Sequence, residues 1–126
     1  MAGSERRLIT ILCVACSEKA LAEVRLLLDH SQIQILSAAT REQAVALCVS
    51  HTVNLALIDG DSIRGQELSL AGALKMIRPA VPVVLLEERH RPDGDLPQHV
   101  DFIARIATPQ ALLNKIQELL NQAEVL

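Results

Sequence analysis

The residues best suited to chemistry in this chain stand at or near the ends of short apolar runs. They offer one thiol, three carboxylates and one guanidinium: Cys16, Asp59, Asp61, Glu87 and Arg105. If the apolar runs are parallel strands, their carboxyl ends meet at one edge of a sheet, where open α/β sheets bind ligands. We therefore expect these side chains, together with Ala15 beside Cys16, to line the candidate site.

The cysteines and histidines exclude several kinds of site. Cys13 and Cys16 are the only close cysteine pair, and no second pair is placed to complete a zinc site. The four histidines form no metal-binding motif. Cys16 precedes a predicted helix, where a thiolate is favoured, so it is either a reactive thiol or a small buried residue. The sequence A-C-S-E also lacks the glycine of a phosphate-binding loop, which argues against nucleotide binding.

Composition and charge narrow the class of protein further. The chain has 126 residues, half of them hydrophobic, which is the size of one domain. Phe102 is the single aromatic residue and the net charge is -3, so we expect no nucleic-acid surface. No apolar run reaches the ~20 residues of a membrane helix. Three scattered cysteines form no disulfide framework, and we therefore expect a cytoplasmic protein that binds no membrane.

Strands and helices alternate along the sequence. Apolar runs rich in β-branched residues predict buried strands at residues 8–14, 33–36, 55–58, 81–86 and 102–106. Periodicity and start signals predict helices at residues 17–28, from residue 40, at 67–77 and from residue 108. This alternation predicts an open parallel α/β sheet with right-handed crossovers.

Two local signals bear on particular elements. T-R-E-Q at residues 40–43 is a capping box, in which the Thr40 hydroxyl bonds the Gln43 amide and the Gln43 side chain reaches back. Residues 87–99 contain Pro92, Gly94 and Pro97, and helical periodicity does not survive these breakers. We therefore expect a loop between the fourth and fifth strands.

This order of elements resembles the receiver domain of bacterial response regulators. The resemblance rests on L-A-L-I-D ending at Asp59, A-A-T-R-E-Q-A-V-A-L, V-P-V-V-L-L, and D-F-I-A-R-I-A-T-P-Q-A-L-L-N-K-I. It covers about residues 8–120 and implies one receiver-like domain over residues 1–126. It implies a flavodoxin-like, doubly wound, five-stranded parallel sheet of order 2-1-3-4-5. Helices would cover both faces, with the fourth helix degraded or replaced by a loop.

The resemblance also implies roles for particular residues. Asp59 matches the aspartate that accepts a phosphoryl group from a sensor histidine kinase. In that family two acidic residues after the first strand help hold Mg²⁺, and a hydroxyl and a lysine at later strand ends contact the phosphoryl group. Such transfer depends on positioning and on neutralisation of charge. Phe102 matches an aromatic switch residue, and we expect it to be partly buried.

The sequence departs from the family pattern where the metal and the phosphoryl group would be held. The differing positions are Ala15 and Cys16 for the acidic pair, Glu87 for the hydroxyl and Arg105 for the lysine. Mg²⁺ prefers oxygen ligands, so we expect no metal or other cofactor unless the site is active, with Asp59 and Asp61 as weak metal candidates. We expect Arg105 to bridge to Asp59 or Glu87 in place of the metal.

We interpret the chain as a degenerate receiver-like domain of a two-component or phosphorelay system. It is expected to act by protein–protein interaction and not as an enzyme. The expected partner is a sensor histidine kinase, a downstream effector domain or protein, or a second copy in a homodimer, docking on the fifth strand and last helix. The alternative is a working receiver phosphorylated on Asp59. A small-ligand binder walled by residues 87–99 and a hydrolase are further alternatives.

Each candidate also has a purely structural interpretation. Asp59 can be a strand-end relic of an active ancestor, and Asp61 a turn residue bonded to its own backbone. Glu87 can be a solvated strand end. His90 and His99 are expected to be exposed in the loop.

Overall fold

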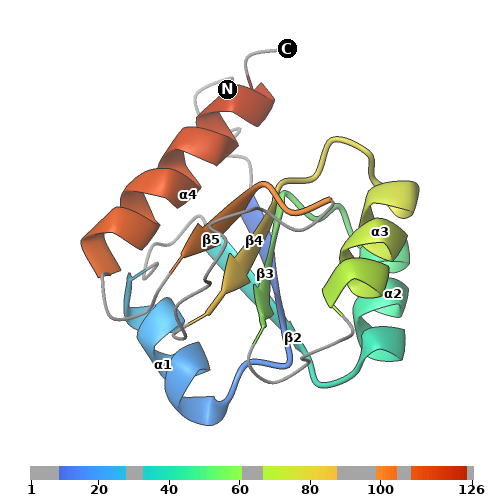
Figure 1. The fold of residues 1–126 in the computed structure, drawn as a ribbon, viewed down its shortest axis with the longest axis horizontal. Helices are drawn as coiled ribbons and strands as arrows, with labels where there is room; N and C mark the ends of the chain where they lie inside the picture. Colours follow the sequence, from blue (N-terminus) through green and yellow to red (C-terminus); the bar gives the residue numbers. More distant parts are fainter. Residues whose placement is uncertain (1–8, 28–32, 61–66, 88–98, 105–108, 125–126) are drawn as a thin grey trace, which may run out of the picture.

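The computed structural model describes residues 9–27, 33–60, 67–87, 99–104 and 109–124. The elements in these ranges are β1 (Ile9–Val14), α1 (Glu18–Leu27), β2 (Ile33–Ala38), α2 (Arg41–Ser50), β3 (Leu55–Asp59), α3 (Glu67–Ile77), β4 (Val83–Leu86), β5 (Phe102–Ala104) and α4 (Pro109–Glu124). The strands form one parallel sheet in the order β2-β1-β3-β4-β5 (Figure 1). The predicted α/β class and the predicted strand order are both confirmed.

The central strands are buried on both sides. Every side chain from Ile11 to Val14 and from Leu55 to Ile58 is at most 1% exposed. This is why these segments are continuous apolar runs and show no alternation of polar and apolar residues. The register pairs Val14 with Ile58, so β1 and β3 end side by side.

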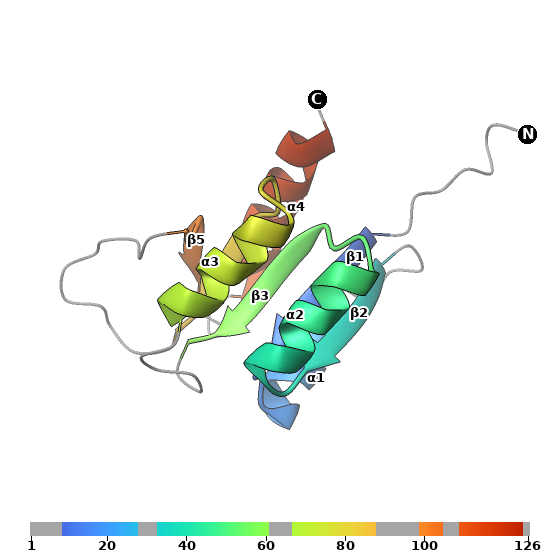
Figure 2. The same ribbon diagram turned by 90° about the vertical axis from the view of Figure 1, so that its right-hand side faces the viewer.

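Helices cover both faces of this sheet, as Figures 1 and 2 show. On one face, α2 and α3 pack against alternate strand residues that include Val14, Ile58 and Leu85. On the other face, α1 and α4 pack against the intervening residues, which include Cys13 and Leu57. Because successive strand residues point to opposite faces, each apolar run supplies both layers of the core.

The predicted capping box at the start of α2 is confirmed for the Thr40 hydroxyl, whereas the Gln43 side chain bonds a different amide from that of Thr40. The Thr40 hydroxyl accepts a hydrogen bond from the Gln43 amide at 3.1 Å. The Gln43 side-chain oxygen reaches back past Thr40 and accepts from the Ala39 amide at 2.7 Å. The box therefore ties α2 to the residue that directly follows β2.

Some predicted bounds differ from the structure. β2 continues to Ala38, two residues beyond the predicted end. β4 begins at Val83 and not at residue 81, because Pro82 has no amide hydrogen to donate to the ladder, although its carbonyl accepts from the Ala56 amide at 2.9 Å. Residues 88–98 of the predicted loop lie outside the described part of the chain, and so do residues 105–106 of the predicted fifth strand. Among the described helices, none combines the length and apolar character needed to cross a bilayer.

Candidate functional site

The loop after β1 places the first two candidate residues at the carboxyl edge of the sheet. The chain bends at Ala15, whose backbone φ is 59°. The Ala15 amide donates to the Ala38 carbonyl at 2.8 Å, which holds the loop beside the end of β2. Cys16 follows, half-buried, and Ser17 then accepts from the Ala20 amide at 3.1 Å through its hydroxyl at the start of α1.

Asp59 lies on the neighbouring strand at the same edge. It is the last residue of β3 and is half-buried. The Gly60 amide donates to the Leu86 carbonyl at 2.8 Å, so the ladder to β4 continues past the aspartate. Strand alternation assigns Asp59 to the face covered by α1 and α4, against which Cys16 also packs. The structure therefore brings these two predicted residues together.

The Cys16 thiol interacts electrostatically with its neighbours Cys13 and Asp59. A hydrogen bond from Cys13 holds the pKa of Cys16 below its ordinary value, against burial and the negative charge of Asp59, which both act to raise it. The same hydrogen bond, together with burial, holds the pKa of Cys13 far above its ordinary value. Sequence reasoning considered this cysteine pair only as a zinc site. Its C-x-x-C spacing was the signal that the two thiols could meet.

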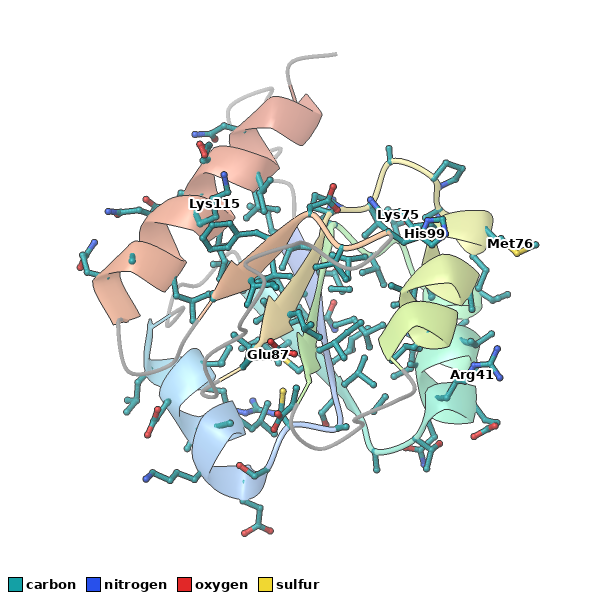
Figure 3. The ribbon with its side chains drawn as sticks, viewed as in Figure 1. Arg41, Lys75, Met76, Glu87, His99 and Lys115 are labelled. Carbon is teal, nitrogen blue, oxygen red and sulfur yellow. The ribbon has the colours of Figure 1, made fainter. Side chains whose placement is uncertain are left out.

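Glu87 occupies the end of the next strand, and its interpretation as a solvated strand end is wrong. Its side chain is buried, with a relative exposure of 8%, and its amide donates to the Ala104 carbonyl at 3.0 Å. Gly60 has no side chain, and the Glu87 Cγ occupies the space that a Cβ there would need. Figure 3 shows Glu87 at the end of β4, between the two helical layers.

Other predicted residues have different outcomes. Phe102 is half-buried, as expected, and the Lys115 Nζ from α4 lies 4.9 Å from the centroid of its ring. His99 is exposed, also as expected, with a φ of 71°. Asp61, His90 and Arg105 lie outside the described residues, so the bridge expected from Arg105 stays a prediction. The same holds for a ligand cleft walled by residues 87–99, most of which are not described.

The described residues at this edge do not fit the Mg²⁺ site of receiver domains. At the positions of the acidic pair, Ala15 offers a methyl group and Cys16 a sulfur, whereas Mg²⁺ takes hard oxygen ligands. Asp59 adds a carboxylate. Within the described ranges, no group of three or more His, Cys, Asp or Glu side chains could hold a metal ion.

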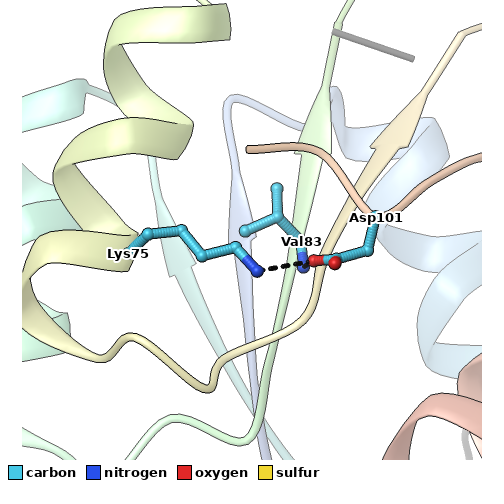
Figure 4. Close-up of polar contacts among 3 residues, drawn as sticks. All are labelled: Lys75, Val83 and Asp101. Carbon is cyan, nitrogen blue, oxygen red and sulfur yellow. Dashed lines mark hydrogen bonds and ion pairs between the residues drawn. The ribbon is translucent and has the colours of Figure 1, made fainter. Parts of the chain in front are cut away.

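A second polar cluster lies at the opposite edge of the sheet, and no motif in the sequence indicates it. The Asp101 Oδ2 atom accepts from the Val83 amide at 2.8 Å and pairs with the Lys75 Nζ at 2.7 Å (Figure 4). The Asp101 amide donates in turn to the Val83 carbonyl at 2.8 Å. Asp101 thus joins the beginnings of β4 and β5 to α3, and this role is structural.

Comparisons with known proteins show which solved structures have the same architecture. No family model matches the chain, and neither does any curated protein. Solved structures do match. A response-regulator receiver domain protein from Clostridium thermocellum is 17% identical over 94% of this chain and 98% of its own, with a TM-score of 0.78. A CheY-like receiver domain protein from Methanospirillum hungatei is 23% identical, and the match covers 93% of this chain and 97% of that one, also with a TM-score of 0.78.

A third similar structure comes from a larger protein. It is the signal receiver domain of an HD domain-containing protein from Pseudomonas fluorescens, 19% identical over 95% of this chain and 91% of that one, with a TM-score of 0.81. At these identities the likeness establishes the fold. The chain therefore has the CheY-like fold of response-regulator receiver domains over nearly its whole length.

Proposed function

We propose that this chain is a receiver-like signalling domain that works through protein–protein interaction and without metal-assisted phosphorylation of Asp59. One observation carries the proposal. The loop after β1 presents Ala15 and Cys16 at the edge where Asp59 ends β3, and neither residue is a ligand for a hard cation. The receiver fold, matched over more than nine-tenths of the chain by several solved structures, supports the signalling part of the proposal.

The charge of the edge supports the same proposal. Receiver chemistry brings a phosphoryl anion to a carboxylate, so it requires cationic groups or a metal that neutralise the negative charge. In this chain Glu87 stands at the position where the family has a hydroxyl. Its side chain is buried beside Gly60, the residue that follows Asp59. An acid in place of a hydroxyl makes the edge less favourable for a second anion.

The partner is expected to be a sensor histidine kinase, a downstream effector domain, or a second copy of the chain. Its expected contact surface is the outer face of α4 with β5. These two elements are connected through the Lys115 ammonium over the Phe102 ring and through the core that Leu112 and Ile116 share with Phe102. The domain has no catalytic role of its own in this proposal, and it acts in the cytoplasm.

The test is intact-mass analysis after incubation with acetyl phosphate and Mg²⁺, with an established response-regulator receiver treated alongside as the positive control. We expect the control to gain a phosphoryl group and this chain to gain none. A gain in this chain that disappears in Asp59→Asn would overturn the proposal and establish the working receiver. Because the chain has no Trp or Tyr, mass is a better readout than intrinsic fluorescence.

A restored variant sharpens this test. Ala15→Asp with Cys16→Asp returns the acidic pair, and Glu87→Thr returns the hydroxyl. If the departures at these positions are what disable the site, the triple variant acquires phosphorylation that depends on Mg²⁺ and on Asp59. If the unaltered chain reacts as fast as the triple variant, then the substitutions do not determine activity and the proposal is wrong.

A further inference from the structure

The two thiols at the end of β1 are brought together by an unusual backbone conformation. In an extended strand, residues three apart point to opposite faces and lie roughly 10 Å apart. Cys13 is nearly fully buried in β1, with a relative exposure of 1%, and Cys16 follows the strand. The bend at Ala15, with its φ of 59°, turns the chain so that both cysteines pack in the same cluster, under α1 and α4.

The two thiols are free and interact with each other, but they differ in burial and in pKa. Their side chains share a hydrogen bond, which raises the pKa of Cys13 and lowers that of Cys16. Cys13 is buried and its pKa is raised, whereas Cys16 is the more accessible sulfur and the one whose pKa is lowered, which favours its thiolate as the nucleophile. The negative charge of Asp59 raises the pKa of Cys16, and Arg25 of α1 lowers the pKa of Cys13. Both effects reduce the difference between the two pKa values.

We propose that Cys13 and Cys16 form a reversible intramolecular disulfide in response to hydroperoxides, with Cys16 as the attacking sulfur and Cys13 as the resolving one. In the first step the Cys16 thiolate attacks one oxygen of hydrogen peroxide, the O–O bond breaks, and a sulfenic acid and hydroxide form. In the second step the Cys13 sulfur attacks the sulfenic sulfur, the S–O bond breaks, and the sulfenic oxygen leaves as water with the Cys13 proton. The pair is oxidised by two electrons and the peroxide is reduced.

The position of the pair gives this modification a structural consequence. A Cys13–Cys16 bond would tie the end of β1 to the residue just before Ser17, whose hydroxyl caps α1. It would also remove the free Cys16 thiol, on whose pKa Asp59 acts. The modification site does not depend on the proposed signalling function, and its test uses no phosphorylation.

The test is peptide mapping of the full chain after treatment with hydrogen peroxide, denaturation and alkylation with N-ethylmaleimide. Trypsin places Cys13 and Cys16 together in the peptide of residues 8–19 and Cys48 alone in residues 42–64, so Cys48 is an internal control. We expect the first peptide to lose the mass of two hydrogen atoms and to take up no maleimide. Cys48 should be fully alkylated, and dithiothreitol should restore the first peptide.

Two variants separate the roles of the cysteines. Cys16→Ser should leave Cys13 reduced under the same peroxide treatment, because Cys13 is buried and protonated. Cys13→Ala should leave Cys16 as a sulfenic acid that dimedone captures. The proposal is overturned if both cysteines of the unaltered chain are alkylated after peroxide, or if Cys16 is oxidised to the sulfinic acid while Cys13 stays a thiol. A disulfide found only between two chains overturns it equally, and the unaltered chain alone decides these outcomes if Cys13→Ala does not fold.

Discussion

The buried side chain of Glu87 lies against the backbone of Gly60, the residue that follows the strand-end aspartate. A Cβ on Gly60 would lie 2.9 Å from the Glu87 Cγ and 3.0 Å from the Cδ1 and Cγ of Leu85. Leu85 is fully buried in β4, and protein cores are packed closely enough that such a side chain moves aside only at a cost. The identity of the residue after Asp59 is therefore set by packing from the neighbouring strand.

Gly60→Ala should lower the free energy of unfolding by about 1–3 kcal/mol, the usual cost of overpacking a core. Urea denaturation followed by far-UV circular dichroism measures it. Gly72→Ala is the matched control, because its Cβ would lie 3.4 Å from the exposed His99 ring and alanine is the better helix former in α3. Equal losses in the two variants would show that the contact with Leu85 and Glu87 does not determine the cost.

Asp101→Ala should destabilise the protein by about 1–3 kcal/mol, because the buried Val83 amide loses its acceptor. Lys75→Ala removes only the ion pair and should cost at most about 1 kcal/mol, since the Asp101 side chain is 38% exposed. Asp101→Asn keeps an acceptor oxygen and should resemble Lys75→Ala. If Lys75→Ala and Asp101→Ala cost the same in urea denaturation, the amide contact is not the main contribution.

Ala15→Gly should raise the free energy of unfolding by about 0.5–1 kcal/mol, because a φ of 59° is strained for alanine and not for glycine. Ala46→Gly is the opposite control. Ala46 is an exposed residue inside α2, where glycine costs about 1 kcal/mol. Thermal and urea unfolding of both variants should give shifts of opposite sign, and a loss of stability in Ala15→Gly would mean that the bend is not strained.

Native-state alkylation should rank the thiols by their pKa values. The pKa of Cys16 is lowered, chiefly by the hydrogen bond from Cys13, whereas burial raises the pKa of Cys48. The thiolate is the reactive form, so with rising pH the iodoacetamide rate of Cys16 should level off at a lower pH than that of Cys48. Peptide mapping of samples quenched at successive times gives both rates.

Removal of the Asp59 charge should increase the difference in reactivity between Cys16 and Cys48. The carboxylate raises the pKa of Cys16, so Asp59→Asn should lower that pKa further and increase the alkylation rate in the pH range below it. Glu42→Gln on α2 removes an exposed carboxylate that does not contribute to the pKa shift of Cys16, and it should leave the rate unchanged. An unchanged rate in Asp59→Asn would show that Asp59 exerts no effective field at the Cys16 sulfur.

Local signals in the sequence determined the elements of this fold. The apolar run at residues 55–58 predicted a doubly buried strand, because a strand buried on both faces of a sheet has no room for polar alternation, and the structure has β3 at Leu55–Asp59. Thr40 identified the start of α2, because a capping hydroxyl acts on an amide only three residues away. Together with the family resemblance, these local signals predicted Asp59 near the end of a strand, Phe102 as a partly buried residue, and the order of the strands in the sheet.

Only the tertiary structure decided how the residues at the edge are used. Whether Glu87 is solvated or buried depends on Gly60, which follows the neighbouring strand β3, and the pairing of Asp101 with Lys75 joins residues 26 positions apart. The meeting of Cys13 and Cys16 depends on a left-handed conformation at an alanine, which has no intrinsic preference for it. Such features follow from contacts made when distant segments pack together, and residue types and spacing along one segment do not encode them.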